Sequence, residues 1–137
     1  MKVIVRIESE LIEAAKSNGV GELFAEESGF RARWTQPAGE GEVIGARYSM
    51  TYDAQTRVLE VERISDYISR MAFCEETRTR GELKIKEGHF ETEIFTHRLR
   101  VPADGYGVAE LRYDLIMAGH EPISNLMVIS VSEVKED

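Results

Sequence analysis

The chain has few of the features that mark secreted or membrane-spanning proteins. Its 137 residues include a single cysteine, Cys74, so no disulfide can form within the chain. That usage is typical of a reducing compartment. No apolar run approaches the roughly 20 residues that a membrane-spanning helix needs. The N-terminal segment MKVIVRIESE also lacks the pattern of a secretory signal. We therefore expect a cytoplasmic protein that has no membrane partner.

Motifs of the common catalytic classes are also missing. Nothing resembles a nucleophile elbow. The glycine-containing segment QPAGEGE, residues 36–42, lacks the lysine and the strand-to-helix context of a phosphate-binding loop. Cys74 has no His–Asp pairing visible in the sequence, which favours a small packed residue over a nucleophile. These absences leave enzymatic activity uncertain and favour a non-enzymatic protein without a cofactor or a metal.

The charge balance and length narrow the remaining classes. Acidic residues outnumber basic ones by 25 to 17, and the net charge is −8. A chain this acidic is not expected to bind nucleic acid through a broad electrostatic patch. The length favours one domain over residues 1–137, and the hydrophobic fraction of 42% is ordinary for a globular protein.

Residues 88–101 (GHFETEIFTHRLRV) carry the clearest strand pattern in the chain. Side chains that alternate along a strand lie on opposite faces of the sheet. One face receives Phe90, Thr92, Ile94 and Thr96, and the other receives mostly charged residues. Pro102 cannot donate to a neighbouring strand, so we expect the strand to end there.

Similar alternation recurs along the chain and predicts about eight or nine strands joined by short turns. Ser28-Gly29 interrupts one of them, which suggests a bulge or a sharp bend within a strand. Residues 11–16 (LIEAAK) either have helical propensity or continue the first strand. No long helix alternates with the strands, so we expect antiparallel pairing. Long strands in a chain of this size favour an all-β, up-and-down barrel of about eight strands, and a two-sheet sandwich is the alternative.

Several of these segments resemble a known family. The matching segments are Ser28-Gly29-Phe30, residues 48–53 with their tyrosines, Arg70 after an apolar strand, residues 88–96 from the glycine to the threonine, Tyr113, and residues 125–131. They are similar to the YwiB-like family of bacterial proteins, which has a calycin (lipocalin-like) β-barrel fold. The chain departs from the family at Ala72, where a glycine is usual. The resemblance implies a fold and no established activity.

Five inward-facing positions are candidate ligand contacts. Strand parity places Trp34, Tyr48, Tyr52, Thr96 and Tyr113 on inward faces. Apolar surface with a few hydroxyl groups is the usual lining of a ligand site. The alternative is that the side chains of a small barrel simply fill its interior.

Arg70 is the candidate charge inside the barrel, because it shares a strand face with Ile68 and Ala72. An inward arginine can bind a carboxylate or phosphate. The alternative is a structural ion pair, or an outward arginine whose stem covers apolar surface. We interpret the histidines and glutamates of residues 89–97 as a solvated outer face, because a metal site needs more ligands with firmer spacing.

The sequence thus predicts non-enzymatic binding of a small, partly apolar ligand, which can be anionic, by Arg70 and the five inward residues. A second hypothesis is a protein-protein interaction or structural module with a filled core. Such a module would act through its acidic surface or as a homodimer.

Overall fold

The chain forms a closed barrel of antiparallel strands. The structure is a computed structural model that describes residues 1–10, 17–38 and 45–134. The strands are β1 (Lys2–Ser9), β2 (Ser17–Glu26), β3 (Gly29–Gln36), β4 (Ala46–Asp53), β5 (Val58–Ile64), β6 (Ile68–Phe73), β7 (Thr77–Ile85), β8 (Gly88–Arg100), β9 (Gly107–Ile116) and β10 (Ile123–Glu133). Each pairs with its neighbours in sequence, and β1 also pairs with β10. This confirms the predicted all-β antiparallel barrel and excludes the two-sheet sandwich.

The strand count differs from the prediction for a local reason. Ser28-Gly29 does not mark a bulge within one strand. The chain turns there, and β2 pairs with β3 from Glu26↔Gly29 onward. Counting this hairpin as two strands raises the upper prediction of nine strands to the ten that are observed. The segment LIEAAK and most of the segment QPAGEGE lie outside the described residues. Within the described ranges, no helix is long and apolar enough to cross a membrane.

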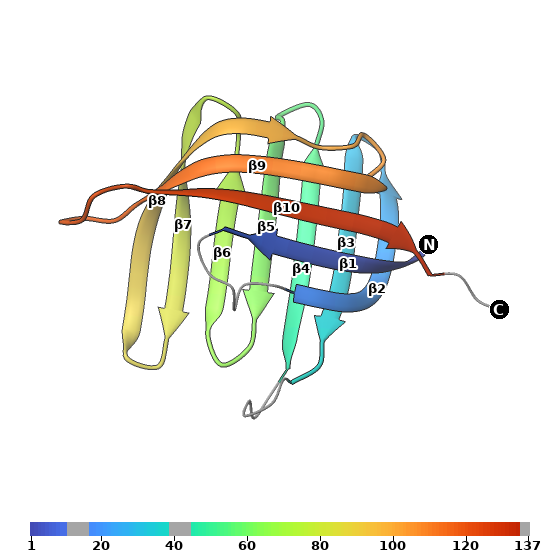
Figure 1. Ribbon diagram of the computed structural model, residues 1–137, viewed down its shortest axis with the longest axis horizontal. Helices are drawn as coiled ribbons and strands as arrows, with labels where there is room; N and C mark the ends of the chain where they lie inside the picture. Colours follow the sequence, from blue (N-terminus) through green and yellow to red (C-terminus); the bar gives the residue numbers. More distant parts are fainter. Residues whose placement is uncertain (11–16, 39–44, 135–137) are drawn as a thin grey trace.

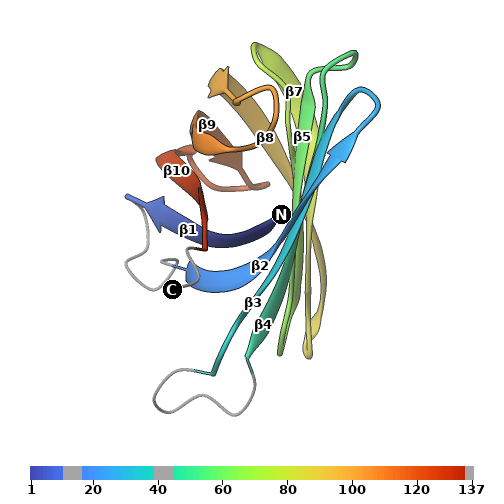
Figure 2. The ribbon, with the colours of Figure 1, turned by 90° about the vertical axis from the view of Figure 1, so that its right-hand side faces the viewer.

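The barrel has two walls whose strands run crosswise. In Figure 1, β3 to β7 run vertically, whereas β1, β9 and β10 run horizontally in front of them. Figure 2 shows the two walls facing each other across the interior. β2 and β8 bend from one wall into the other. A register shift between Thr96 and Arg98 accompanies the bend in β8, as expected because an extra residue bends a strand.

One half of the interior is filled with large side chains. The completely buried ones include Phe30, Leu59, Phe73 and Ile94. The turn after β8 packs against this half through Gly105, whose φ is +80°. A Cβ there would lie only 2.6 Å from Cγ of Phe30, so the close approach requires glycine. We call this half the closed end.

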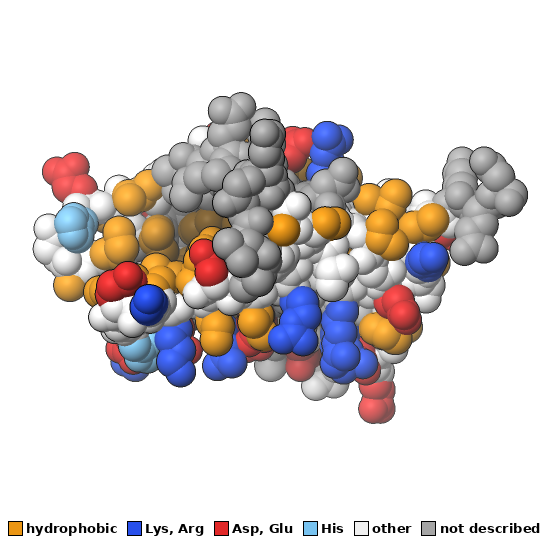
Figure 3. Space-filling view, turned by 90° about the horizontal axis from the view of Figure 1, so that it is seen from below, with side chains coloured by type: hydrophobic (Ala, Val, Ile, Leu, Met, Phe, Trp, Pro, Cys, Tyr) orange, Lys and Arg blue, Asp and Glu red, His pale blue; other side chains and the backbone are white. Residues whose placement is uncertain are grey.

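The opposite half carries the β5–β6 and β7–β8 connections, at the bottom of Figure 1. The strand register aligns one row of interior positions there, namely Trp34, Tyr48, Arg63, Ser69, Leu83 and Phe90. Trp34 is buried, whereas Phe90 at the other end of the row is 50% exposed. Seen from below, hydrophobic side chains gather around a hollow on this side (Figure 3). We call this half the open end and this row the mouth row.

Candidate functional site

The structure corrects the orientation predicted for Arg70. Its side chain is 59% exposed and lies on the outer face of β6, where Nη1 is 3.8 Å from Glu82. Its Nε donates to Glu62 on the neighbouring strand. The error arose because β6 is apolar on both faces. Phe73 belongs to the core and Met71 packs against it, so these two residues occupy the inner face of β6. Arg70 therefore shares the outer face with Ile68 and Ala72.

The other five predicted residues lie inside the barrel, in three places. Tyr52 is near the closed end, with its ring centroid 5.7 Å from that of Phe30. Trp34 and Tyr48 are in the mouth row and stack at 5.1 Å with an interplanar angle of 3°. Thr96 and Tyr113 are directly opposite each other on β8 and β9. That any of them binds a ligand stays a prediction.

Among the described residues, Arg63 is an arginine that points into the barrel interior. It lies in the mouth row beside Tyr48, whose hydroxyl accepts a hydrogen bond from Arg63 Nε at 3.2 Å. The guanidinium carbon is 4.3 Å from the centre of the Tyr67 ring, a cation–π distance. Among the described residues, the carboxylate that pairs with Arg63 is Asp66, whose Oδ1 is 3.9 Å from Nη1, beyond hydrogen-bonding range.

The burial of Arg63 leaves part of its guanidinium unused. The side chain is only 22% exposed. Nη1 is buried and has no hydrogen-bond partner among the described residues. A buried charge is costly unless it is paired and hydrogen-bonded. The site therefore has a donor available for an acceptor that enters from outside.

Sequence reasoning missed Arg63, although a signal was present. Along β5, Leu59 and Val61 alternate with Glu60 and Glu62. Leu59 is completely buried, so the same parity carries Arg63 inward. Arg63 continues the apolar side of β5, whereas Arg70 lies in a strand with two apolar faces. Arg63 was therefore the better candidate for an inward charge.

A second polar group lies deeper in the barrel. The Ser9 hydroxyl donates to Asn125 Oδ1 at 3.0 Å, and Asn125 Nδ2 donates to the Tyr113 hydroxyl at 2.8 Å. Ser9 is half-buried, whereas Asn125 and Tyr113 are buried. Burial raises the pKa of the Tyr113 phenol above 10.0, and the hydrogen bond from Asn125 partly opposes that rise. Tyr113 is therefore a neutral hydrogen-bonding group at ordinary pH.

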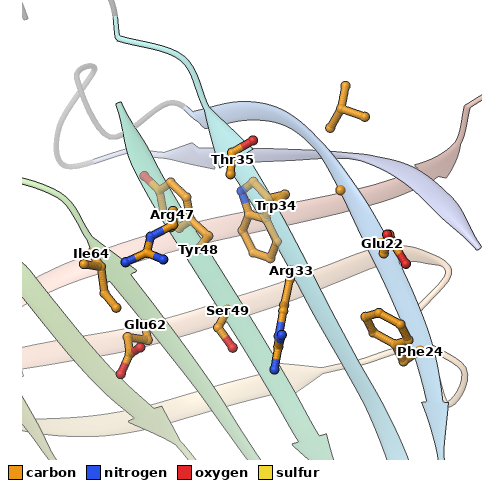
Figure 4. Close-up of a pocket in the computed structure, with 12 residues that line it drawn as sticks. Glu22, Phe24, Arg33, Trp34, Thr35, Arg47, Tyr48, Ser49, Glu62 and Ile64 are labelled. Atoms are coloured by element: carbon orange, nitrogen blue, oxygen red, sulfur yellow. The ribbon is translucent and has the colours of Figure 1, made fainter. Parts of the chain in front are cut away.

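A groove of about 560 Å³ also crosses the outer face of β2 to β5 (Figure 4). Arg33 and Arg47 project from this face, and Glu22 and Glu62 lie on the same surface. The charges of the two arginines and the two glutamates balance, so the groove has no net charge to select a cation or an anion.

The titratable side chains of the outer face form pairs and not metal sites. Within the described parts of the chain, no group of three or more His, Cys, Asp or Glu residues is placed to hold a metal ion. His97 Nε2 is 2.9 Å from Asp114 Oδ2, and the Ser124 hydroxyl donates to the other oxygen of Asp114 at 2.7 Å. This hydrogen bond from His97, followed by that from Ser124, lowers the pKa of Asp114 below 3.8. Because Asp114 separates Ser124 from His97, the three do not form a nucleophile and base.

These features define a class of protein: a closed up-and-down antiparallel barrel whose described side chains are packed at one end and partly exposed at the other. The crystal structure of the ywiB protein from Bacillus subtilis has a similar fold, with a TM-score of 0.68 at 14% sequence identity. The similarity covers 98% of this chain and 89% of that one. At this identity the likeness shows the fold alone.

The sequence itself places the chain in a family. Residues 3–129 match the family described as a domain of unknown function, DUF1934, and the chain belongs to it. This assignment and the structural likeness together confirm the predicted resemblance to YwiB-like proteins. No curated protein matches the chain significantly.

Proposed function

We propose that the open end of the barrel binds a small, partly apolar ligand with an anionic group, without catalysing a reaction. The observation that carries this proposal is the inward guanidinium of Arg63, whose Nη1 is buried without a hydrogen-bond partner among the described residues. A guanidinium matches a carboxylate or phosphate with two parallel hydrogen bonds. An anion beside Arg63 would supply the missing acceptor and neutralise the buried charge.

The rest of the open end supports an apolar body for this ligand. Leu83 and Phe90 follow Arg63 in the mouth row and are partly or half exposed. Met71 is only partly buried against the core one row deeper. Apolar walls with a few placed polar groups are typical of small-molecule sites. The single free cysteine fits the cytoplasmic setting that this proposal assumes.

Binding can be measured through Trp34, which is the only tryptophan and stacks on Tyr48 next to Arg63. We would titrate the protein with decanoate, a simple apolar carboxylate, and follow the fluorescence of Trp34. Arg63→Gln should weaken binding at least tenfold, because hydrogen bonds to charged groups contribute about 1.5–3 kcal/mol.

Arg70→Gln is the matched control, since it makes the same chemical change on the outer face one strand away. It should leave the decanoate affinity unchanged. Equal affinities for the Arg63→Gln and wild-type proteins would refute the proposed site. Thermal unfolding of both variants would show whether either change acts through the fold.

A second candidate function is association through the outer surface. Ile4 and Val20 lie directly opposite each other on β1 and β2, and they are 37% and 50% exposed. We propose that this strip is where a homodimer or a partner protein would attach. Association through an unpaired strand edge is excluded for the described strands, because each of them is paired on both sides. Sedimentation of the wild type and of Val20→Glu tests the idea, and a monomer at all concentrations would exclude the homodimer.

A further inference from the structure

The groove on the outer face of β2 to β5 is lined by charged side chains that the barrel itself does not pair (Figure 4). Glu22 and Arg33 are directly opposite each other on β2 and β3, yet no ion pair within 4.0 Å joins them. Arg47, on β4, has no ion pair with any described residue either. By contrast, Glu62 and Arg70 are opposite each other on β5 and β6 and do form an ion pair. The groove therefore presents charges of both signs to a partner.

Apolar side chains lie among these charges. Val20, two residues before Glu22 on the same face of β2, is 50% exposed. Phe24, two residues after Glu22, and Ile64 on β5 also line the groove. Val20 is directly opposite Ile4, so the groove is continuous with the exposed strip of β1 and β2. Apolar contacts with polar groups around them are typical of protein–protein interfaces.

The balance of charges in the groove indicates which partner fits it. A partner with one sign of charge is not selected by a groove without net charge. A second copy of the chain is selected, because a two-fold dimer brings the same patch of both copies together. Each positive group of the patch can then face a negative group of the other copy. This complementarity opposes the repulsion between two chains that each have a net charge of −8.

We propose that two copies of this chain associate through the groove about a two-fold axis that runs parallel to the strands, between β2 and β3. Glu22 and Arg33 are directly opposite each other across that line, so the axis places Glu22 of each copy against Arg33 of the other. It likewise places Val20 of each copy against Thr35 of the other. The inference rests on the second candidate function, association through the outer surface, and names the partner and the contacts that select it.

Charge reversal tests this pairing by sedimentation. The wild type should shift from monomer to dimer as its concentration rises from micromolar to millimolar. Glu22→Arg and Arg33→Glu should each weaken dimerisation about tenfold or more, because the two-fold axis repeats every like-charge contact. An equimolar mixture of the two variants should recover the dimer, since each contact between positions 22 and 33 of the two chains then joins opposite charges.

Two charge-matched variants separate this pairing from an effect of overall charge. Glu121→Arg lies in the connection between β9 and β10, and Arg80→Glu lies on β7. They make the same two changes of charge at exposed positions outside the proposed interface. Both should dimerise as the wild type does. Thermal unfolding of all four variants shows that each is folded, so a lost dimer cannot be mistaken for a lost fold.

The outcomes separate the inference from the function beneath it. If the wild type is a monomer at all concentrations, the homodimer is excluded and the inference is wrong. If the wild type dimerises but the charge reversals act no more strongly than their controls, or the mixture stays monomeric, the pairing of Glu22 with Arg33 is refuted. Association through Ile4 and Val20 then stands or falls by Val20→Glu. The titration with decanoate tests the ligand site independently of every one of these results.

Discussion

The closed end and the open end of the barrel share the same long strands but differ in what their inward side chains contact. At the closed end, Phe30 and Phe73 are surrounded by other core residues, and Gly105 brings the turn after β8 against the Phe30 ring. At the open end, Phe90 is half exposed, and Nη1 of Arg63 has no hydrogen-bond partner in the described part of the chain. The comparison teaches that the stabilising core and the proposed ligand site are located at different ends of one barrel.

The largest expected difference in the free energy of unfolding is between alanine variants of two phenylalanines that face the same interior. Phe73→Ala should lower the free energy of unfolding by about 3–5 kcal/mol, because it creates a cavity in a filled region. Phe90→Ala should cost less than about 1 kcal/mol, since half of that side chain already contacts solvent. Urea denaturation of the two variants measures both values. Similar losses would show that the open end is also part of the core.

A pair of glycines isolates the packing at the closed end. Gly105 and Gly119 both have φ of +80°, but a Cβ meets nothing within 4 Å at Gly119. Both alanine variants should suffer the backbone strain, and Gly105→Ala should lose a further 1–3 kcal/mol, roughly, from overpacking against Phe30. Thermal unfolding compares them. Equal destabilisation would mean that the turn does not press on the core.

High pH should reveal the burial of the Tyr113 phenol. Because the pKa of Tyr113 is raised in the folded state, its contribution to stability is complete below about pH 10 and declines as the pH rises through the raised pKa. Tyr113→Phe should therefore flatten the loss of stability above pH 10. Tyr106→Phe is the control, since Tyr106 is 44% exposed. If both variants lose stability with pH as steeply as the wild type, the burial of Tyr113 has no energetic consequence.

The smallest effect is expected on the outer surface. The hydrogen bond from His97 lowers the pKa of Asp114 in the folded state. The contribution of ionised Asp114 to the free energy of unfolding is thus present above about pH 4 and is lost as the pH falls through the lowered pKa. Asp114→Asn should cost only about 0.2–1 kcal/mol near neutral pH, because the pair is partly solvated. The difference from the wild type should shrink in acid, and a difference that grows there would contradict this account.

Sequence reasoning succeeded where one strand determines its own geometry. The pattern over residues 88–101 predicted β8 and placed Ile94 and Thr96 on the inward face. Alternation is a local signal, because each side chain differs in polarity from its sequence neighbours. The same reasoning placed Tyr48 and Tyr113 inside the barrel.

It failed where both faces of a strand are apolar, or where distant strands must meet. In β6, Met71 and Phe73 lie on one face, and Ile68 and Ala72 lie on the other. Both faces are apolar, so the alternation could not show to which face Arg70 belongs. The contact of Ser9 with Asn125 joins residues 116 positions apart and depends on the register of β1 against β10. A single sequence contains no local signal for that register.

The pairing of β1 with β10 also has a consequence for how the protein is made. The first strand leaves the ribosome long before its partner, and it has no second neighbour until residues 123–133 have been synthesised. Folding of barrels dominated by such distant pairings is slow, because long loops must close before the contacts form. The hydrogen bond from Ser9 to Asn125 spans that closing seam. The closed interior, and with it the proposed ligand site, can therefore form only after β10 has been synthesised.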